Sequence, residues 1–267
     1  MTIDCEIDDR TLLIRINRPE ALNALDVASM RGLNEALRRF RDDPHLLVAV
    51  LTGSGDRAFC TGADLKRTTP ASGSFASSYF APHEESIGDG MYVRAITLSE
   101  LRIPKPLIAA VNGHALGAGL ELALDCDLRI ASRNATFGLP EARWASVPAV
   151  GGVSNLLRSI PRAVAMKMIL TGDRIDAREA HRVGLVSDVV PPGELVETAL
   201  ALARRLCANG PLAVMSLKTL AMRTGDLPLS QSIAMEQLLW GVLRDTEDRI
   251  EGRAAFTDRR TPHYHGR

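Results

Sequence analysis

Short apolar runs alternate with segments of helical periodicity in the first part of the chain, and this alternation most constrains its fold. The strand-like runs are residues 10–17, 46–51, 106–111 and 128–131. Asp26 precedes a segment whose apolar positions recur at helical spacing up to Phe40, and residues 117–125 form a second helical segment. Strands separated by helices predict βαβ units and a mainly parallel sheet.

The pattern changes in the last third of the sequence. Asp176 with Glu179 three residues later predicts the start of a short helix. From Glu194 onward the chain has an almost wholly helical pattern. We therefore expect an α/β core domain over residues 1–195 and a C-terminal helical region over residues 196–267.

Residues 67–90 interrupt this order with a stretch rich in Ser, Thr, Ala, Gly and Pro. A long irregular insertion in a compact domain is often a lid or a binding loop. A tolerated surface insertion accounts for the composition equally well, and the sequence leaves both interpretations open.

Composition is that of an ordinary globular protein, with 46% hydrophobic and 24% charged residues in a chain of 267. Lys+Arg and Asp+Glu are equal at 32 each, so the chain lacks the basic field that nucleic acid or an acidic membrane would attract. The first residues have no secretory leader pattern, and no apolar run is long enough to span a bilayer. We expect a cytoplasmic protein that binds neither nucleic acid nor membrane.

Several familiar catalytic devices are missing from the sequence. The glycines after Val111 are not spaced for dinucleotide binding, and neither a Gly-Lys-Ser/Thr loop nor a Gly-x-Ser-x-Gly elbow occurs. The six histidines form no metal pattern, and the solitary His114 is expected to be structural. The sequence therefore predicts no metal and no cofactor.

The four cysteines, Cys5, Cys60, Cys126 and Cys207, are far apart and lack metal-ligand spacing. We expect buried, reduced thiols. Cys60 lies in a suspected site loop, but no activating base accompanies it in sequence, so packing is the preferred interpretation.

Two glutamates lie in segments of small residues that favour close backbone approach. Glu121 ends residues 113–121, where glycines lead into a helix that begins near Ala118, and Glu141 follows Gly138-Leu139-Pro140. The first N–H groups of a helix have no internal partner, so the Ala118 N–H could bind a developing negative oxygen. A second N–H, from Ala63, would complete an oxyanion hole. Two carboxyl groups beside it indicate acid/base chemistry on a substrate held by the main chain.

Residues 58–65, 112–121 and 137–141 resemble the signature of the crotonase (enoyl-CoA hydratase/isomerase) superfamily, closest to the enoyl-CoA hydratases. Residues 17–25, 170–175 and 255–262 extend the resemblance over nearly the whole chain. It implies an α/β fold with a crotonase-like ββα spiral core and a helical C-terminal trimerisation region. It also implies an acyl-CoA thioester substrate and assembly as a homotrimer or a dimer of trimers.

By this resemblance the two backbone N–H groups of Ala63 and Ala118 polarise the thioester carbonyl. Stabilising the enolate oxygen more than the ground-state carbonyl accelerates the reaction. Family hydratases have glutamates at the positions of Glu121 and Glu141, and both are present here. The implied reaction is addition of water to a trans-2-enoyl-CoA, with Glu121 as the base on water and Glu141 as the donor of a proton to C2.

The resemblance also implies substrate and CoA contacts, with CoA as part of the substrate. These fall on Ala21, Leu22, Thr61, Asp64, Leu65, Lys66, Ala149, Phe256 and Arg259. Phe256 and Arg259 are expected to reach the CoA of a neighbouring subunit. Ala118 and Ala149 stand where relatives often have glycine, and Glu20 stands where some have a basic residue, which bears on rate and substrate shape more than on reaction class.

Alternatives remain at this point. A same-fold isomerase, or a dehydratase acting on 3-hydroxyacyl-CoA, has a closely related site. A non-catalytic acyl-CoA-binding scaffold is another class, and RNA binding is disfavoured because residues 26–43 contain no lysine. The acyl group is undetermined. Five large residues either line its pocket or simply pack: Phe75, Tyr79, Phe80, Met91 and Trp144.

Overall fold

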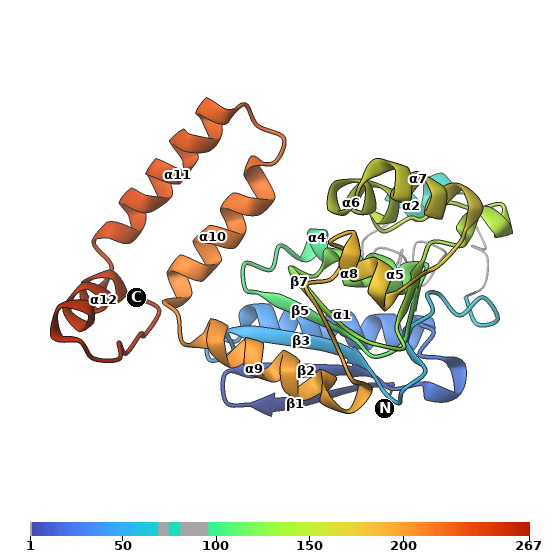
Figure 1. Ribbon diagram of the computed structural model, residues 1–267, viewed down its shortest axis with the longest axis horizontal. Coiled ribbons are helices and arrows are strands. Elements are labelled where there is room, and N and C mark those ends of the chain that lie inside the picture. The colour runs from blue at the N-terminus through green and yellow to red at the C-terminus, as the bar shows by residue number, and fades with distance from the viewer. Residues whose placement is uncertain (1, 69–74, 81–95) are drawn as a thin grey trace.

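The structure is a computed structural model that describes residues 2–68, 75–80 and 96–267 (Figure 1). Its strands are β1 (Ile3–Asp8), β2 (Thr11–Ile16), β3 (Val48–Gly53), β4 (Ala58–Cys60), β5 (Leu107–Val111), β6 (His114–Leu116), β7 (Leu128–Ser132), β8 (Thr136–Gly138), β9 (Ile175–Asp176) and β10 (Asp188–Val190). Its α-helices are α1 (Val27–Asp42), α2 (Phe75–Phe80), α4 (Leu98–Leu101), α5 (Ala118–Asp125), α6 (Gly152–Ser159), α7 (Arg162–Thr171), α8 (Ala177–Arg182), α9 (Leu195–Cys207), α10 (Pro211–Thr224), α11 (Leu229–Arg244) and α12 (Glu247–Asp258). Short 3₁₀ turns are η1 (Pro19–Ala21), η3 (Glu141–Trp144) and η4 (Pro192–Glu194).

The strands form two sheets that the chain visits in turn. The larger has the order β1-β2-β3-β5-β7-β10, and the smaller has the order β4-β6-β8-β9. Each of the successive pairs β3/β4, β5/β6 and β7/β8 places its first strand in the larger sheet and its second in the smaller. Among the described strands, pairing along the spiral is parallel, and only β1 with β2 and β8 with β9 are antiparallel. The mainly parallel α/β sheet expected from the sequence is confirmed.

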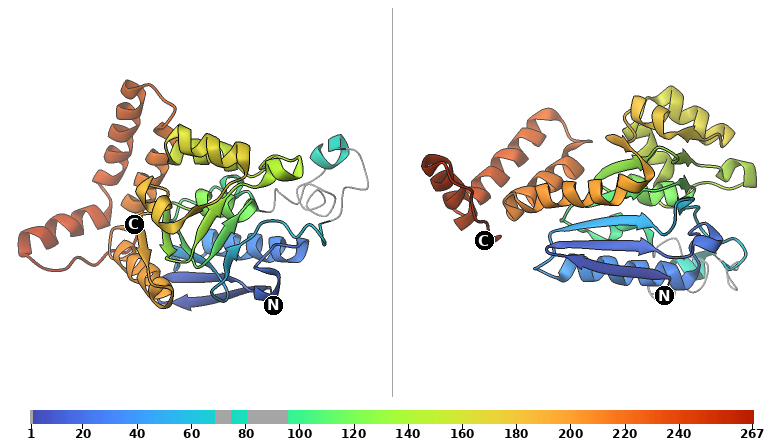
Figure 2. Two further views of the ribbon diagram at one scale, coloured as in Figure 1. Left: turned by 45° about the vertical axis from the view of Figure 1, so that its right-hand side comes forward. Right: turned by 60° about the horizontal axis from the view of Figure 1, so that its bottom comes forward.

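The larger sheet is covered on both faces. Alternate side chains of a strand point to opposite sides, so one strand contributes to a core on each face. On β2, Leu12 and Ile14 join the main core together with the apolar stripe of α1, whereas Leu13 joins a second core with Ala199 and Ala203 of α9. Helices α1 and α9 therefore lie on opposite faces of the sheet (Figure 2). Burial on both sides accounts for the uninterrupted apolar runs in β3 and β5.

Helix α1 begins where the sequence predicted. The carboxylate of Asp26 accepts a hydrogen bond from the Ser29 backbone N–H at 2.9 Å, which satisfies one of the otherwise free donors of the first turn. Asp176 caps α8 in the same way by accepting from the Glu179 N–H at 2.7 Å. Both predicted N-caps are confirmed.

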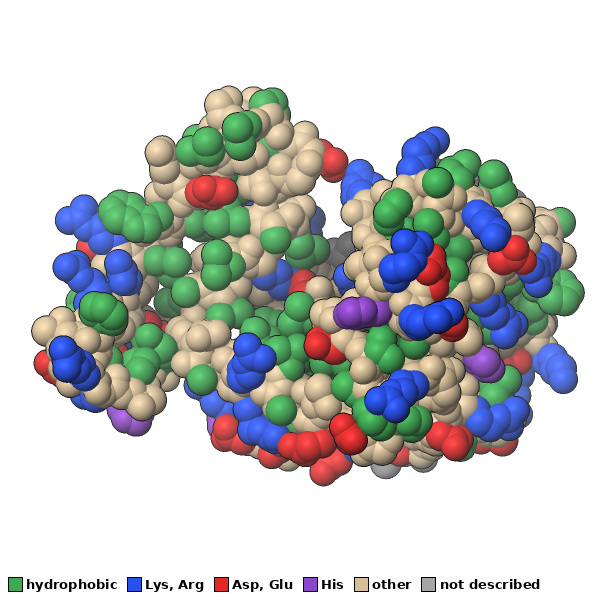
Figure 3. Space-filling view, in the orientation of Figure 1, with side chains coloured by type: hydrophobic (Ala, Val, Ile, Leu, Met, Phe, Trp, Pro, Cys, Tyr) green, Lys and Arg blue, Asp and Glu red, His purple; other side chains and the backbone are tan. Residues whose placement is uncertain are grey.

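The C-terminal helices divide into two parts. Helix α9 begins at the expected start of the helical region but packs on the larger sheet. Helix α10 borders the core, where its Lys218 binds Asp127 at 2.8 Å, and α11 and α12 extend away from the core (Figure 1). We call α10, α11 and α12 the C-terminal arm. Large apolar side chains are exposed along it, as Figure 3 shows in green. They are Leu217, Met222, Leu229, Ile233, Leu238, Trp240, Val242, Ile250 and Phe256.

All four cysteines are free thiols, as expected. Cys60 and Cys126 are buried, and burial raises the pKa of each thiol to about 12, which agrees with packing. The expectation of burial is wrong for Cys5, because it lies on the edge strand β1, which is mostly solvent-facing, and Cys207 is only partly buried. None of the helices in the described ranges is long and apolar enough to cross a membrane.

Candidate active site

Glu121 lies in the first turn of α5 and is 2% exposed. Its Oε1 accepts hydrogen bonds from the backbone N–H groups of Val150 at 2.7 Å and Gly152 at 2.8 Å. These donors come from the loop that leads into α6, 29 and 31 residues later in the chain. The carboxylate is therefore held by main chain, which fixes its position without an opposite charge.

This arrangement requires glycine at position 152. A methyl group added there would lie 2.9 Å from Glu121 Oε1 and 2.9 Å from the Cβ of Pro148. Such distances are shorter than real Cβ contacts, so a larger residue would displace the carboxylate or the loop.

Glu141 is the first residue of η3, directly after the turn that follows β8. The Gly117 N–H donates to the Gly138 carbonyl at 3.0 Å, and this bond brings the end of β8 beside the start of α5. A methyl group at Gly117 would lie 3.0 Å from Glu141 Oε1. The Oε2 of Glu141 is buried and has no hydrogen-bond partner among the residues that the structure describes. An oxygen of this kind is available to a substrate or a water molecule.

Burial raises the pKa of both carboxyl groups above their ordinary value. For Glu121, loss of solvation outweighs the backbone donors, which lower the pKa. For Glu141, loss of solvation is again the main cause, and the nearby charge of Glu121 raises the pKa further. The charge of Glu121 therefore favours the protonated form of Glu141, which suits two carboxyl groups with different roles.

Two backbone segments adjoin next to these carboxyl groups, and each contributes one of the alanines predicted for the oxyanion hole. Gly62 has a φ of +92°, and a methyl group there would lie 3.2 Å from the Ala118 nitrogen, so the two segments adjoin. The Ala118 N–H belongs to the first turn of α5 and has no acceptor within the helix. Ala63 pairs with Leu25 in an isolated parallel β-bridge. The two bonds of this bridge are made by the residues on either side of Ala63: the Leu25 N–H donates to the Gly62 carbonyl, and the Asp64 N–H donates to the Leu25 carbonyl. The N–H of Ala63 itself therefore points to the opposite side.

These groups share one cavity of about 220 Å³. Its lining includes both glutamates and both alanines, together with Thr61, Gly62, Leu65, Ile96, Gly117, Pro140, Trp144, Ser146, Val147, Pro148, Ala149 and Val150. The four residues predicted as the catalytic and oxyanion groups thus lie at a single site. Mostly apolar walls around a few polar groups are typical of a pocket for a small organic substrate.

A sequence model of the enoyl-CoA hydratase/isomerase family matches residues 6–267. The chain belongs to this family. It is 47% identical over 266 residues to an (E)-benzylidenesuccinyl-CoA hydratase from Thauera aromatica, covering 100% of both chains. It is 40% identical to a 2,3-dehydroadipyl-CoA hydratase from Escherichia coli (strain K12), covering 97% of this chain and 96% of the relative. A crystal structure of an enoyl-CoA hydratase from Bacillus anthracis superimposes with a TM-score of 0.89 at 35% identity, covering 100% of both chains.

These comparisons confirm the crotonase superfamily and its spiral fold, and the relatives support a hydro-lyase that acts on CoA thioesters.

The remaining predicted substrate and CoA contacts fall into two groups, one near the cavity and one in the C-terminal arm. Near the cavity, the Thr61 hydroxyl donates to the Leu22 carbonyl at 3.2 Å. Ala21, the residue before Leu22, is the last residue of η1. Leu65 and Ala149 line the cavity, and Lys66 is exposed close by.

Asp64 has a structural partner. Its carboxylate binds the guanidinium of Arg18 at 2.9 Å, and Arg18 also lies 3.5 Å from the Asp26 carboxylate. Arg18 is 5% exposed, so this buried ion cluster ties the η1 segment to the loop that carries Ala63. The arrangement assigns the Asp64 side chain to holding that loop.

Phe256 and Arg259 are not brought to the cavity by their own chain. They lie on α12 and at its C-cap, in the C-terminal arm, and Phe256 is 86% exposed. Neither is among the residues that line the cavity.

The candidate acyl-pocket residues also separate. Trp144 lines the cavity and is 71% exposed, so simple packing does not describe it. Tyr79 and Phe80 are exposed on α2 and are not among the described lining residues. Met91 and the side chain of Phe75 lie outside the described part of the structure.

Sequence reasoning did not find the Val150 and Gly152 donors that hold Glu121. The Gly151-Gly152 pair before a helix was the available signal, since Gly151 adopts a φ of +90° at the N-cap of α6. Nothing in the local sequence indicates that this turn faces α5.

Proposed function

We propose that this protein is an enoyl-CoA hydratase, which adds water across the C2–C3 double bond of a trans-2-enoyl-CoA and yields a 3-hydroxyacyl-CoA. The observation that carries the proposal is the placement of Glu121 and Glu141 on one cavity with the Ala63 and Ala118 N–H groups. A single glutamate beside the same donors would support many other reactions of a thioester. Two interacting carboxyl groups supply a base and an acid at once.

In this mechanism the thioester carbonyl oxygen accepts hydrogen bonds from Ala63 and Ala118. Charge moves to that oxygen as water adds to C3, so the two donors bind the enolate more strongly than the substrate. The Ala118 donor has the further support of the α5 N-terminus, whose dipole favours a negative oxygen.

Glu121, ionised and held by Val150 and Gly152, takes a proton from the attacking water. Glu141, protonated, delivers its proton to C2 as the enolate collapses. The raised pKa of Glu141 favours its protonated form when Glu121 is charged, and this matches the division of roles. The reverse sequence dehydrates a 3-hydroxyacyl-CoA at the same groups.

The CoA portion is proposed to run along Ala21, Leu22, Thr61, Asp64 and Leu65, with Lys66 near its phosphates. We further propose a homotrimer or a dimer of trimers in the cytoplasm. The exposed apolar side chains of the C-terminal arm support an assembly that covers them. In such an assembly Phe256 and Arg259 would reach the CoA of a neighbouring subunit. The mass of the protein in solution, measured by analytical ultracentrifugation, tests the assembly, and the mass of a monomer would contradict it.

The activity is tested with a panel of enoyl-CoA thioesters of different chain length and branching, together with the thioesters for which the relatives are named. Loss of absorbance of the conjugated thioester measures hydration, and product analysis distinguishes it from a shift of the double bond. We expect Glu121→Gln and Glu141→Gln each to lower kcat by about 10²-fold or more. Glu179→Gln serves as the matched control, because Glu179 is partly exposed, does not line the catalytic cavity and is paired with Arg182. Unchanged hydration in both site variants would overturn the proposal.

A further inference from the structure

Building on the proposed hydratase function, we propose that Asp125 is a positioning residue for the base Glu121. Its carboxylate fixes the first turn of α6, and that turn and the loop directly before it carry the N–H groups that hold Glu121. Asp125 has no place in the mechanism above and does not line the catalytic cavity.

Asp125 and Glu121 are one helical turn apart on α5 and therefore lie on the same side of the helix. Asp125 Oδ1 accepts a hydrogen bond from the Asn155 side-chain amide at 2.7 Å. Helix α5 thus contacts α6 through two carboxylates, Glu121 at the loop and Asp125 at the first turn.

Asn155 is bonded to the loop that binds Glu121 through its backbone, and its side chain lies close to that loop. Its backbone N–H donates to the Gly151 carbonyl at 2.8 Å, and a methyl group at Gly151 would lie 3.1 Å from its Nδ2 atom. Asn155 is therefore folded beneath the Gly151 turn. Val150 and Gly152, the two donors to Glu121, flank Gly151 on either side. A shift of Asn155 would move both donors together.

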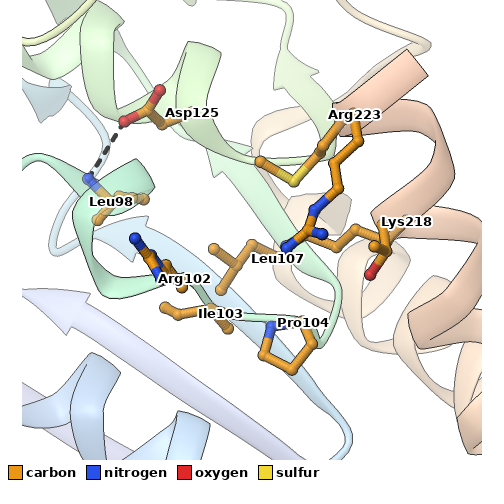
Figure 4. A pocket seen from close by; sticks show the side chains of 10 residues that line it. Leu98, Arg102, Ile103, Pro104, Leu107, Asp125, Lys218 and Arg223 are labelled. Carbon is orange, nitrogen blue, oxygen red and sulfur yellow. Dashed lines mark hydrogen bonds between the residues drawn. The ribbon is translucent and has the colours of Figure 1, made fainter.

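The second carboxylate oxygen of Asp125 anchors another segment near the cavity. Asp125 Oδ2 accepts from the Leu98 backbone N–H at 3.3 Å, the bond drawn as a dashed line in Figure 4. Leu98 begins α4, and Ile96, two residues earlier, lines the catalytic cavity. One carboxylate thereby joins α4, α5 and α6.

The partners of Asp125 are neutral amides, although cations are near. Arg102, Lys218 and Arg223 line the adjoining cavity of about 290 Å³, but Lys218 binds Asp127 at 2.8 Å, and no ion pair to Asp125 occurs among the described residues (Figure 4). Burial raises the pKa of Asp125 to about 6, so keeping this carboxylate charged costs stability. Directional hydrogen bonds, rather than charge neutralisation, are what this carboxylate contributes.

Asp125→Ala tests the proposal, with Asp127→Ala as the matched control. Asp127 lies two residues further along, and its carboxylate accepts from the Leu107 N–H at 2.7 Å and from Lys218, but it has no bond to α6. We expect Asp125→Ala to lower kcat by about tenfold to hundredfold with KM within about twofold, because a small displacement of a catalytic group has effects of this size. Asp127→Ala should lower the melting temperature and leave kcat within about twofold.

A charge exchange provides the decisive pair of variants. Asn155→Asp places two carboxylates against each other and should lower kcat, because like charges at this distance repel. Adding Asp125→Asn restores a hydrogen bond of reversed polarity and should recover most of the lost kcat. A double variant no better than Asn155→Asp would overturn the proposal, as would an effect of Asp127→Ala on kcat equal to that of Asp125→Ala.

Hydrogen exchange of the Val150–Gly152 amides, followed by mass spectrometry, separates this proposal from the proposed function. Protection of these amides should fall in Asp125→Ala and persist in Asp127→Ala, whatever reaction the protein catalyses. If wild-type protein hydrates no thioester, the proposed function fails by itself. Unchanged protection of these amides in Asp125→Ala would contradict the positioning role of Asp125 even when hydration is confirmed.

Discussion

Gly152 and Glu121 are in direct contact: the Gly152 N–H donates to Glu121 Oε1 at 2.8 Å, and a methyl group on Gly152 would lie 2.9 Å from the same oxygen. The donor that orients the base can approach it only because the donor residue has no side chain. This relationship makes the α6 turn part of the proposed active site, although no side chain from that turn has a role in the proposed mechanism.

Gly152→Ala should therefore displace Glu121. We expect kcat to fall by about tenfold to hundredfold, and stability to fall by about 1–3 kcal/mol from overpacking. Kinetics with an enoyl-CoA and thermal unfolding measure the two effects. Gly225→Ala is the control, because Gly225 has a right-handed helical backbone and nothing lies within 4 Å of an added methyl group. Normal kcat in Gly152→Ala would contradict the tight contact.

The pH dependence of kcat/KM should be bell-shaped. In the proposed mechanism Glu121 must be ionised, and burial raises its pKa, so the acidic limb should lie above the ordinary glutamate value of about 4.3. Glu141 must be protonated, so activity should also fall as pH rises through its raised pKa. Glu141→Gln should abolish the alkaline limb in its residual activity. An acidic limb at the ordinary value would show that Glu121 is not perturbed in solution.

Asp125 should make stability depend on pH in a defined direction. Its folded pKa of about 6 exceeds its ordinary value of 3.8, so the folded state holds the proton more firmly than the unfolded state. The stability linked to this group is complete below pH 3.8 and is lost as the pH rises through about 6. The melting-temperature advantage of wild type over Asp125→Asn should shrink across this window. A constant difference would contradict the raised pKa.

Cys60 should be dispensable for catalysis. It is fully buried beside Gly62 and its pKa is raised to about 12, so it is a poor nucleophile at neutral pH. Cys60→Ala should keep kcat within about threefold and lower stability by about 1 kcal/mol, since it removes one buried sulfur atom. In folded protein a thiol reagent should modify the exposed Cys5 first and leave Cys60 and Cys126 unmodified until unfolding. Complete loss of activity in Cys60→Ala would restore the nucleophile interpretation.

Local signals predicted the elements that position the site. Asp26 and Asp176 cap helices as expected, because an N-cap bond forms within three residues and does not depend on the rest of the fold. The apolar runs that become β3 and β5 were also clear, since strands buried on both faces have few polar positions. Helix α9 was predicted as a helix, but its packing on the larger sheet, as distinct from the C-terminal arm, depends on contacts between distant residues.

The sequence by itself singled out the groups that we propose do the chemistry: Glu121, Glu141 and the glycine-flanked N–H groups of Ala63 and Ala118 follow from residue type, local spacing and family resemblance. Tertiary structure alone decided how these groups are held. The Val150 and Gly152 bonds to Glu121 and the Asp125–Asn155 bond join residues about thirty positions apart. The buried Oε2 of Glu141 has no partner among the residues that the structure describes. The physical reason is that burial and hydrogen bonds between separate elements set the pKa and the orientation of each glutamate side chain. Neither property depends only on the residues next to that glutamate in the sequence.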